Sequence, residues 1–289
     1  MRYKKVLLAL LPLSLLAKPS AVGDVLTRKG KVKIEWSTTY LHMEGAQGIT
    51  EPVQFQTLHG DVVVIPMTTG TRLTNKDLLS SSLLLRFGAT DRFELYAAAG
   101  GYASMTRTLD GTTYTSEKDY DLNTLSLGAT YRIKEETDTP SLLVGASGNV
   151  LERITLADTT QNNYLKTFRL FAASYYTVDP LVFALNASYS RSRTKYAGKH
   201  SLSQGDLFSL TPSVYFAVNP TTSLQWGARY TYQGATKNDG NQTGLQGSGV
   251  AYFMGAGHEF ESGLLIDVQA EYRPGSSSTS LSSTLSYTF

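Results

Sequence analysis

Apolar residues recur at every second position in several segments of this 289-residue chain. In residues 264–273, for example, Leu, Ile, Val, Ala and Tyr alternate with Leu, Asp, Gln, Glu and Arg. A period of two is that of a β-strand with one apolar and one polar face, whereas an amphipathic helix has a period near 3.6. The same alternation holds in 31–40, 124–133 and 223–232, and helical periodicity is absent. We therefore expect an all-β chain.

Short turns and long polar connections separate these segments in strict alternation. The short turns are rich in Asp, Asn, Pro and Gly, and lie at 89–92, 134–140, 178–180, 218–221 and 260–263. The longer polar stretches are 44–75, 105–118, 152–163, 192–204, 233–247 and 274–278. Unequal connections of this kind are typical of barrels with short periplasmic turns and long external loops. The sequence predicts a transmembrane antiparallel up-and-down β-barrel of about twelve strands, with both termini periplasmic.

The composition agrees with a barrel whose two faces differ in polarity. Charged residues make up 17%, against about a quarter in a typical soluble domain. Tyrosine and phenylalanine are abundant, at 18 and 11 residues, and yet the mean hydropathy is slightly negative, at −0.17. A charge in the apolar column of a strand would cost about 2–4 kcal/mol at mid-membrane, and the four clearest strands have none there. The absence of cysteine excludes disulfides and thiolate metal sites.

The N-terminal stretch has the pattern of a secretory signal. A basic head at residues 1–5 precedes an apolar run at 6–17, which is shorter than the roughly 20 residues that a spanning helix needs. We expect a signal peptide at 1–21, cleaved after Ala17 or Ala21, and one barrel domain at 22–289; a retained membrane anchor is the alternative. Cleavage after Ala21 removes four cations and no acid, so the net charge goes from +2 to −2. So small a charge does not indicate nucleic-acid binding.

The last segment, 281–289, alternates Leu281, Leu285, Tyr287 and Phe289 with Ser and Thr. It resembles the last strand of bacterial outer-membrane barrels, which typically ends in phenylalanine and is read by the barrel-assembly machinery. The resemblance implies an outer-membrane location, with membrane lipid and that machinery as partners, and makes Tyr287 and Phe289 a C-terminal assembly signal. A soluble β-sandwich or propeller would also show many short alternating strands and remains the alternative.

The polar face of the predicted strands carries charges of both signs. By alternation, the residues that face the lumen are Lys33, Glu35, Arg86, Glu94, Arg132, Arg169, Arg229, Asp267, Glu271 and Arg273. Such groups around a narrow pore set which solutes pass. We therefore expect a porin-like channel for passive diffusion of small solutes. Two alternatives stay open: the charges pair and fill a small closed barrel, or the barrel is a scaffold that presents its external loops for adhesion or assembly.

Residues 83–95, Leu-Leu-Leu-Arg-Phe-Gly-Ala-Thr-Asp-Arg-Phe-Glu-Leu, form the most specific local motif. It resembles the strand–turn–strand signature of the outer-membrane transporters labelled "MetA-pathway of phenol degradation". The matching residues are Arg86, Gly88, Thr90, Asp91, Arg92 and Glu94, with Phe87 in place of tyrosine. From the residues themselves we expect Gly88 and Asp91 to form the turn, and Arg86 to pair with Glu94. The resemblance implies transport and leaves the substrate open.

Histidines next to serine or aspartate invite a comparison with hydrolases. His200 precedes Ser201 and Ser203, and His59 precedes Asp61, but neither arrangement has the spacing of a catalytic triad. No phosphate-cradling or metal-ligand motif is present either. We therefore expect no catalytic site, no metal and no cofactor; an outer-membrane lipase or protease that uses His200 is the third hypothesis.

Two local features lead to structural expectations. Pro212 lies inside a strand and removes a hydrogen-bond donor, so we expect a bulge or bend there. The first long connection, 44–75, carries the apolar run 62–65, which would be an aggregation liability in water. That run either extends the barrel wall or folds inward and narrows the lumen. We favour the constriction, which predicts higher conductance on deletion of 60–67.

Overall fold

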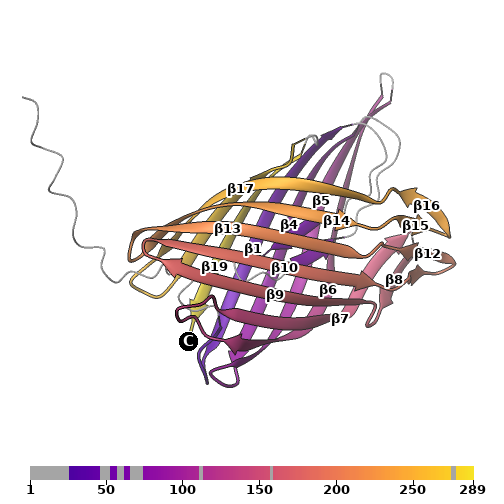
Figure 1. Cartoon of the computed structure of the whole chain (residues 1–289). Coiled ribbons are helices and arrows are strands. Elements are labelled where there is room, and N and C mark those ends of the chain that lie inside the picture. Colours follow the sequence, from indigo (N-terminus) through magenta and orange to yellow (C-terminus); the bar gives the residue numbers. More distant parts are fainter. Residues whose placement is uncertain are drawn as a thin grey trace, which may run out of the picture.

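The computed structural model describes residues 26–45, 53–56, 62–65, 74–110, 113–156, 159–274 and 278–289 (Figure 1). The predicted signal peptide at 1–21 lies outside these residues. All regular secondary structure in the described part of the chain is β-strand. None of these residues forms a helix that is long and apolar enough to cross a membrane.

Twelve long strands form a closed antiparallel barrel, as the alternation predicts. They are β1 (Val32–Gly45), β4 (Thr74–Gly88), β5 (Phe93–Asp110), β6 (Thr113–Lys134), β7 (Leu142–Leu156), β9 (Thr167–Val178), β10 (Leu181–Ser192), β13 (Leu207–Asn219), β14 (Thr222–Gln233), β17 (Gly247–Glu259), β18 (Leu265–Tyr272) and β19 (Ser278–Thr288). Each strand pairs with the next, and β19 returns to β1. Because the ring is closed, its strands leave no free edge.

The seam between β1 and β19 runs from the Lys33–Thr288 pair to the Met43–Ser278 pair without a register shift. The amide of Phe289 extends it by donating a hydrogen bond to the carbonyl of Val32, at 2.8 Å. All five short turns lie at the same end of the barrel as Val32 and Phe289 (Figure 1). We call this end the short-turn end and the other the long-hairpin end.

The long connections are more ordered than the prediction of polar loops allowed. Residues 105–118, expected as a loop, belong to β5 and β6 apart from 111–112. Further strands are β8 (Thr159–Asn163), β11 (Lys195–Ala197), β12 (His200–Ser203), β15 (Thr236–Asn238) and β16 (Asn241–Gly244). The last four form a separate sheet beyond the barrel. Asp239 and Gly240, with φ of 50° and 81°, make the tight turn that joins β15 to β16.

The two faces of the barrel differ as the alternation predicts. The outer face exposes large apolar side chains, among them Trp36, Leu83 and Leu185, while Glu35, Leu84 and Asn186 next to them point inward and are buried or half-buried. In water such an outer surface would be an aggregation liability, whereas in lipid it is the favourable side. The interior, by contrast, is lined mainly by small polar residues.

Three interior aromatic rings each lie against a glycine on the neighbouring strand. Tyr96 is the register partner of Gly128, Phe171 of Gly145, and Phe253 of Gly227. A Cβ atom at these glycines would lie only 2.3, 2.1 and 2.2 Å from the respective ring. The rings therefore lie flat on the wall because their partners have no side chain.

Of the bulge or bend expected at Pro212, the bulge is absent. The β13–β14 register is the same on both sides of it, with Leu210 opposite Tyr230 and Ser213 opposite Gly227; only the pairs at 211 and 212 drop out of the ladder. Losing a donor thus interrupts the ladder without inserting a residue. The irregularity in this hairpin lies between Ala217 and Asn219, beside the turn.

The first long connection contains a small hairpin, β2 (Val53–Gln56) paired with β3 (Val62–Ile65). Within the described residues these two strands form a sheet of their own and do not extend the barrel sheet. The remainder of 60–67, and the side chains of the hairpin, lie outside the described residues. That this segment constricts the lumen stays a prediction.

Candidate solute pathway inside the barrel

The ten residues predicted to face the lumen all lie on the inner face of the sheet and are buried or half-buried. Glu94 is fully inaccessible, whereas Arg273, at the opposite end, has 26% of its side chain exposed. They do not form one cluster but separate into groups along the barrel axis. Whether solutes touch them stays a prediction.

The first group is a charged knot near the short-turn end, made by Lys33, Glu35, Arg86 and Glu94. Arg86 donates from Nε and Nη2 to Glu94 Oε1, at 2.8 and 2.6 Å, and Nη1 lies 3.3 Å from Glu35 Oε1. Lys33 Nζ lies 3.2 Å from the same Glu35 oxygen. Two cations and two carboxylates therefore neutralise one another inside the barrel, and the predicted Arg86–Glu94 pair is present.

A segment that sequence reasoning missed closes over this knot. The amide of Thr27 donates to Glu94 Oε2 at 2.6 Å, and the side chain of Leu26 is buried beside it. The segment 26–31 crosses Gly88, where a Cβ would lie 2.2 Å from the carbonyl oxygen of Arg28. Gly88 was expected to form the turn, but it is the last residue of β4 and is needed because another backbone passes over it.

The second group lies in the β14–β18 wall. Arg229 Nη1 donates to Glu271 Oε2 at 2.5 Å, and Arg273 Nη2 lies 4.0 Å from Glu271 Oε1. The guanidinium of Arg229 also sits 5.7 Å from the ring centre of Phe253. The pair is thus fixed on the wall by an ionic contact on one side and a ring on the other.

Beside Arg229 and Asp267 lies a polar cavity with about 450 Å³ of empty space, open solvent included. Its wall is made largely of hydroxyl and amide side chains: Asn186, Thr211, Ser213, Tyr215, Gln225, Gln269, Ser282 and Thr284. A smaller space of about 200 Å³ shares Asn186 and Thr211 with it and reaches Arg169 and Phe171. Groups that both donate and accept hydrogen bonds can replace part of the water shell of a polar solute.

A third space, of about 780 Å³, open solvent included, lies at the long-hairpin end. Tyr102 donates to Asp119 there at 2.7 Å, and Arg153 lies 3.4 Å from Asp121. Leu78, Ile154, Leu156 and Leu202 make up the apolar part of the lining. This space at the long-hairpin end therefore offers both charged and apolar contacts to a solute.

An apolar cluster lies on the inner wall and contributes Phe171 to the lining of the smaller space. Leu84, Tyr96 and Phe171 form one buried cluster inside the barrel, supported by Ala98. Rings that lie flat on the wall leave more room than rings that project, but they still narrow the lumen. The described interior therefore contains several spaces, lined by polar, charged and apolar side chains.

One buried ion pair was missed because both partners were assigned to polar loops. Lys195 Nζ lies 2.7 Å from Glu152 Oε1, and both side chains are almost inaccessible. Asn149 and Thr167 also donate to Glu152 Oε1, at 3.0 and 2.8 Å. The two charges are 43 positions apart in the sequence, since 195 − 152 = 43, and no local pattern links them.

The histidine considered for hydrolysis has a structural partner. His200 Nδ1 lies 2.7 Å from Asp239 Oδ2, and the amide of Ser201 donates to Asp239 Oδ1 at 2.6 Å. These hydrogen bonds on its carboxylate hold the pKa of Asp239 below its ordinary value, the bond from His200 contributing most. Asp239 thus joins β12 to the β15–β16 turn. Within the described residues His200 forms no hydrogen bond with a serine hydroxyl, and no metal-binding group of three or more ligands is present.

Neither protein-family models nor curated proteins match this sequence. Among solved structures, an outer membrane channel from Pseudomonas putida F1 is 14% identical and has a TM-score of 0.62, covering 92% of this chain and 98% of its own. The KdgM porin is 11% identical (TM-score 0.44; 88% and 99% covered). The translocator domain of the autotransporter NalP from Neisseria meningitidis is also 11% identical (TM-score 0.49; 90% and 88% covered). The fold is thus that of a bacterial outer-membrane β-barrel.

Proposed function

We propose that this protein is a narrow channel of the bacterial outer membrane, through which small polar solutes diffuse. The proposal needs no cofactor and no chemical step. The observation that carries it is the polar cavity beside Arg229 and Asp267, in a closed barrel whose outer face is apolar. A barrel that served only as a wall could fill this space with apolar side chains at lower desolvation cost.

The outer face supports placement in a bilayer. On neighbouring strands Leu170, Tyr189, Phe208 and Tyr232 are consecutive register partners, and all four are exposed. We define this row as the outer girdle, because aromatic side chains gather at the boundary between hydrocarbon and headgroups. By the usual asymmetry of such barrels, the short-turn end and both termini face the periplasm and the long hairpins face outward.

The similarity to the Pseudomonas putida channel concerns the fold, and channel activity is proposed here together with it. The motif at 83–95 further suggests a place in the transporter family labelled "MetA-pathway of phenol degradation". Three residues of that motif, Arg86, Gly88 and Glu94, contact one another's strands or the crossing segment 26–31 at the short-turn end. No phenolic substrate follows from this.

A closed scaffold is the second candidate function, and the charged knot is the observation that favours it. In that reading the lumenal charges pair with one another, as Arg86 does with Glu94, and the ordered sheet β11–β12–β15–β16 is the surface presented outward. The two functions differ in one measurable property, because a scaffold has no conductance. For either function we also propose that Tyr287 and Phe289, stacked edge to face at 4.8 Å, carry the assembly signal.

Planar-bilayer recording of the refolded protein separates the two. A channel gives discrete conductance steps, and Arg229→Gln should shift the reversal potential in a salt gradient toward cations, because the lining of the polar cavity then loses its cation and keeps the acid Asp267. The matched control Arg92→Gln removes an exposed cation from a short turn and should leave selectivity unchanged. A bilayer that stays sealed under all voltages, with the protein inserted, rejects the channel and favours the scaffold.

A further inference from the structure

At the long-hairpin end of the barrel, strands β9 and β10 and the segments next to them carry a concentration of positive charge. Residues 159–205 contain six Lys and Arg side chains and one acid, Asp179, which lies in the short turn at the opposite end of the barrel. Two of the cations, Arg169 and Lys195, point into the protein and are buried. The other four, Lys166, Arg191, Arg193 and Lys199, are exposed or half-exposed.

Register places three of these cations directly above the outer girdle. Leu170 faces Tyr189 in the girdle, and the next outward-facing pair is Phe168 with Arg191. Beyond it, the amide of Arg193 donates to the carbonyl of Lys166 at 2.8 Å. These rows lie roughly 7 and 14 Å farther along the strands, at about 3.4 Å per residue. Apolar contacts thus give way to positive charge over the distance in which a bilayer changes from acyl chains to headgroups.

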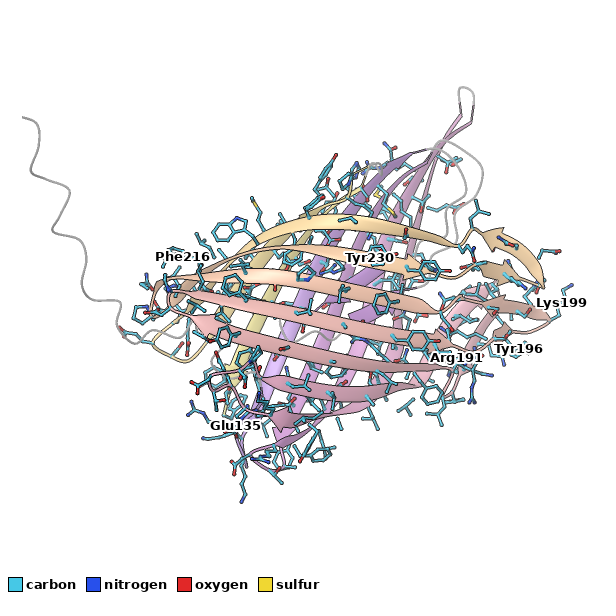
Figure 2. The ribbon with its side chains drawn as sticks, in the orientation of Figure 1. Glu135, Arg191, Tyr196, Lys199, Phe216 and Tyr230 are labelled. Atoms are coloured by element: carbon cyan, nitrogen blue, oxygen red, sulfur yellow. The ribbon has the colours of Figure 1, made fainter. Side chains whose placement is uncertain are left out.

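Aromatic rings hold two of the cations in place. The Arg193 guanidinium lies 5.5 Å from the ring centre of Phe168, and Lys166 Nζ lies 5.4 Å from that of Tyr196. Figure 2 shows Arg191, Tyr196 and Lys199 near one another at the long-hairpin end, far from Phe216 and Glu135. A cation fixed by a ring keeps its hydrogen-bond donors free for an outside acceptor.

Among the described residues, the acids near this surface already have partners. Within the described chain none of Lys166, Arg191 and Arg193 forms an ion pair with a carboxylate, in contrast to buried Lys195. Asp206, which lies just before the neighbouring strand β13, accepts a hydrogen bond from the girdle residue Tyr189 at 2.5 Å. The surface is therefore complementary to an external anion at the height of the headgroups.

We propose that Lys166, Arg191 and Arg193 form a docking surface for the phosphorylated sugar headgroup of an outer-leaflet glycolipid, of the lipopolysaccharide class. The acyl chains of the lipid lie along Leu170 and Phe168, and its phosphates meet the cations above. Arg is well suited to this contact because its fork of donors matches two phosphate oxygens at once. The inference rests on the membrane orientation proposed above.

The test measures lipid binding by native mass spectrometry of the refolded full chain in detergent, with diphosphoryl lipid A as the probe. Each cation near an anionic surface contributes roughly a factor of five to the affinity. The triple variant Lys166→Gln/Arg191→Gln/Arg193→Gln should therefore bind lipid A on the order of 100-fold more weakly than the parent. Arg193→Gln alone should lose roughly fivefold and serves if the triple variant does not fold. The control Lys29→Gln/Lys31→Gln/Lys134→Gln removes three exposed cations at the short-turn end and should bind as the parent does.

Two further arms identify the source of the phosphate. Fully dephosphorylated lipid A should bind at least tenfold more weakly, and millimolar inorganic phosphate should not displace the lipid. Equal binding of the dephosphorylated lipid, an equal loss in the control variant, or displacement by free phosphate would each overturn the proposal. Conductance steps of the triple variant in bilayers report on the channel separately, so the two proposals fail in distinguishable ways.

Discussion

Arg86 donates two hydrogen bonds to a single oxygen of Glu94, although water reaches 3% of one side chain and none of the other. The second Glu94 oxygen accepts from the backbone of Thr27. One carboxylate therefore joins two strands and the segment that crosses them. Such an arrangement is costly to break because each charge is left without water when its partner is removed.

Arg86→Gln should lower the free energy of unfolding by about 3–5 kcal/mol, since it leaves the carboxylates of Glu94 and Glu35 in a dry interior with one cation fewer. The measurement is urea unfolding from vesicles, followed by tryptophan fluorescence. Arg86→Gln/Glu94→Gln should recover much of the loss, because neither group is then charged. A loss no larger than that of exposed Arg92→Gln would show that the knot contributes little.

Gly128→Ala should destabilise the barrel by about 1–3 kcal/mol, because the three atoms nearest to the new methyl group all belong to the side chain of Tyr96. Tyr96→Leu in the same chain should restore most of that stability. At Gly145 rescue by Phe171→Leu should be incomplete, since a Cβ there also lies 2.8 Å from the backbone oxygen of Ala129. Unfolding midpoints of the four variants give the comparison; equal rescue at both sites would contradict it.

The contact between β12 and the β15–β16 turn should weaken in acid. Hydrogen bonds from His200 and Ser201 lower the pKa of Asp239 in the folded protein, so the stabilisation is present above the ordinary pKa of 3.8 and is lost as the pH falls through the lowered value. Proteolysis at the long-hairpin end by an acid-active protease should therefore rise below about pH 3.8. Asp239→Asn should show high cleavage already at pH 5, and an unchanged pH profile in that variant would refute the assignment.

Lys195→Met should loosen the sheet β11–β12–β15–β16, because Glu152 then stays buried without its cation and keeps the hydrogen bonds from Asn149 and Thr167. Hydrogen exchange of the amides in β11 and β12 reports this directly, and we expect it to accelerate more than tenfold. Lys199→Met, at an exposed position of the same hairpin, is the matched control. Similar exchange in both variants would mean that the buried pair does not stabilise the sheet.

The barrel itself could be predicted from the sequence because its signal is local. Alternation over eight to ten residues fixes which face of a strand is apolar, and this placed Arg229 and Asp267 on the inner face. The pairing of Arg86 with Glu94 was also predictable, since the turn at 89–92 brings them together. Both inferences need only neighbours in sequence.

What the sequence did not reveal depends on contacts between distant segments. Lys195 and Glu152 were assigned to solvated loops, because nothing near either residue indicates burial. Gly88 was assigned to the turn, whereas its role follows from the backbone of 27–28 that passes above it. Pro212 was expected to cause a bulge or bend, and no bulge forms because the strands on both sides hold the register across the missing donor.

The pairing of interior rings with glycines also bears on how the strands find their alignment. If β9 slid two residues along β7, Phe171 would face Leu143 or Ser147 in place of Gly145. A similar slip would set Tyr96 against Ser126 or Thr130, and Phe253 against Gln225 or Arg229. Each misalignment drives a ring into a side chain, whereas backbone hydrogen bonds alone would tolerate it. The three glycines thus provide the positions at which the rings fit between neighbouring strands, and they favour one alignment of the strands during folding.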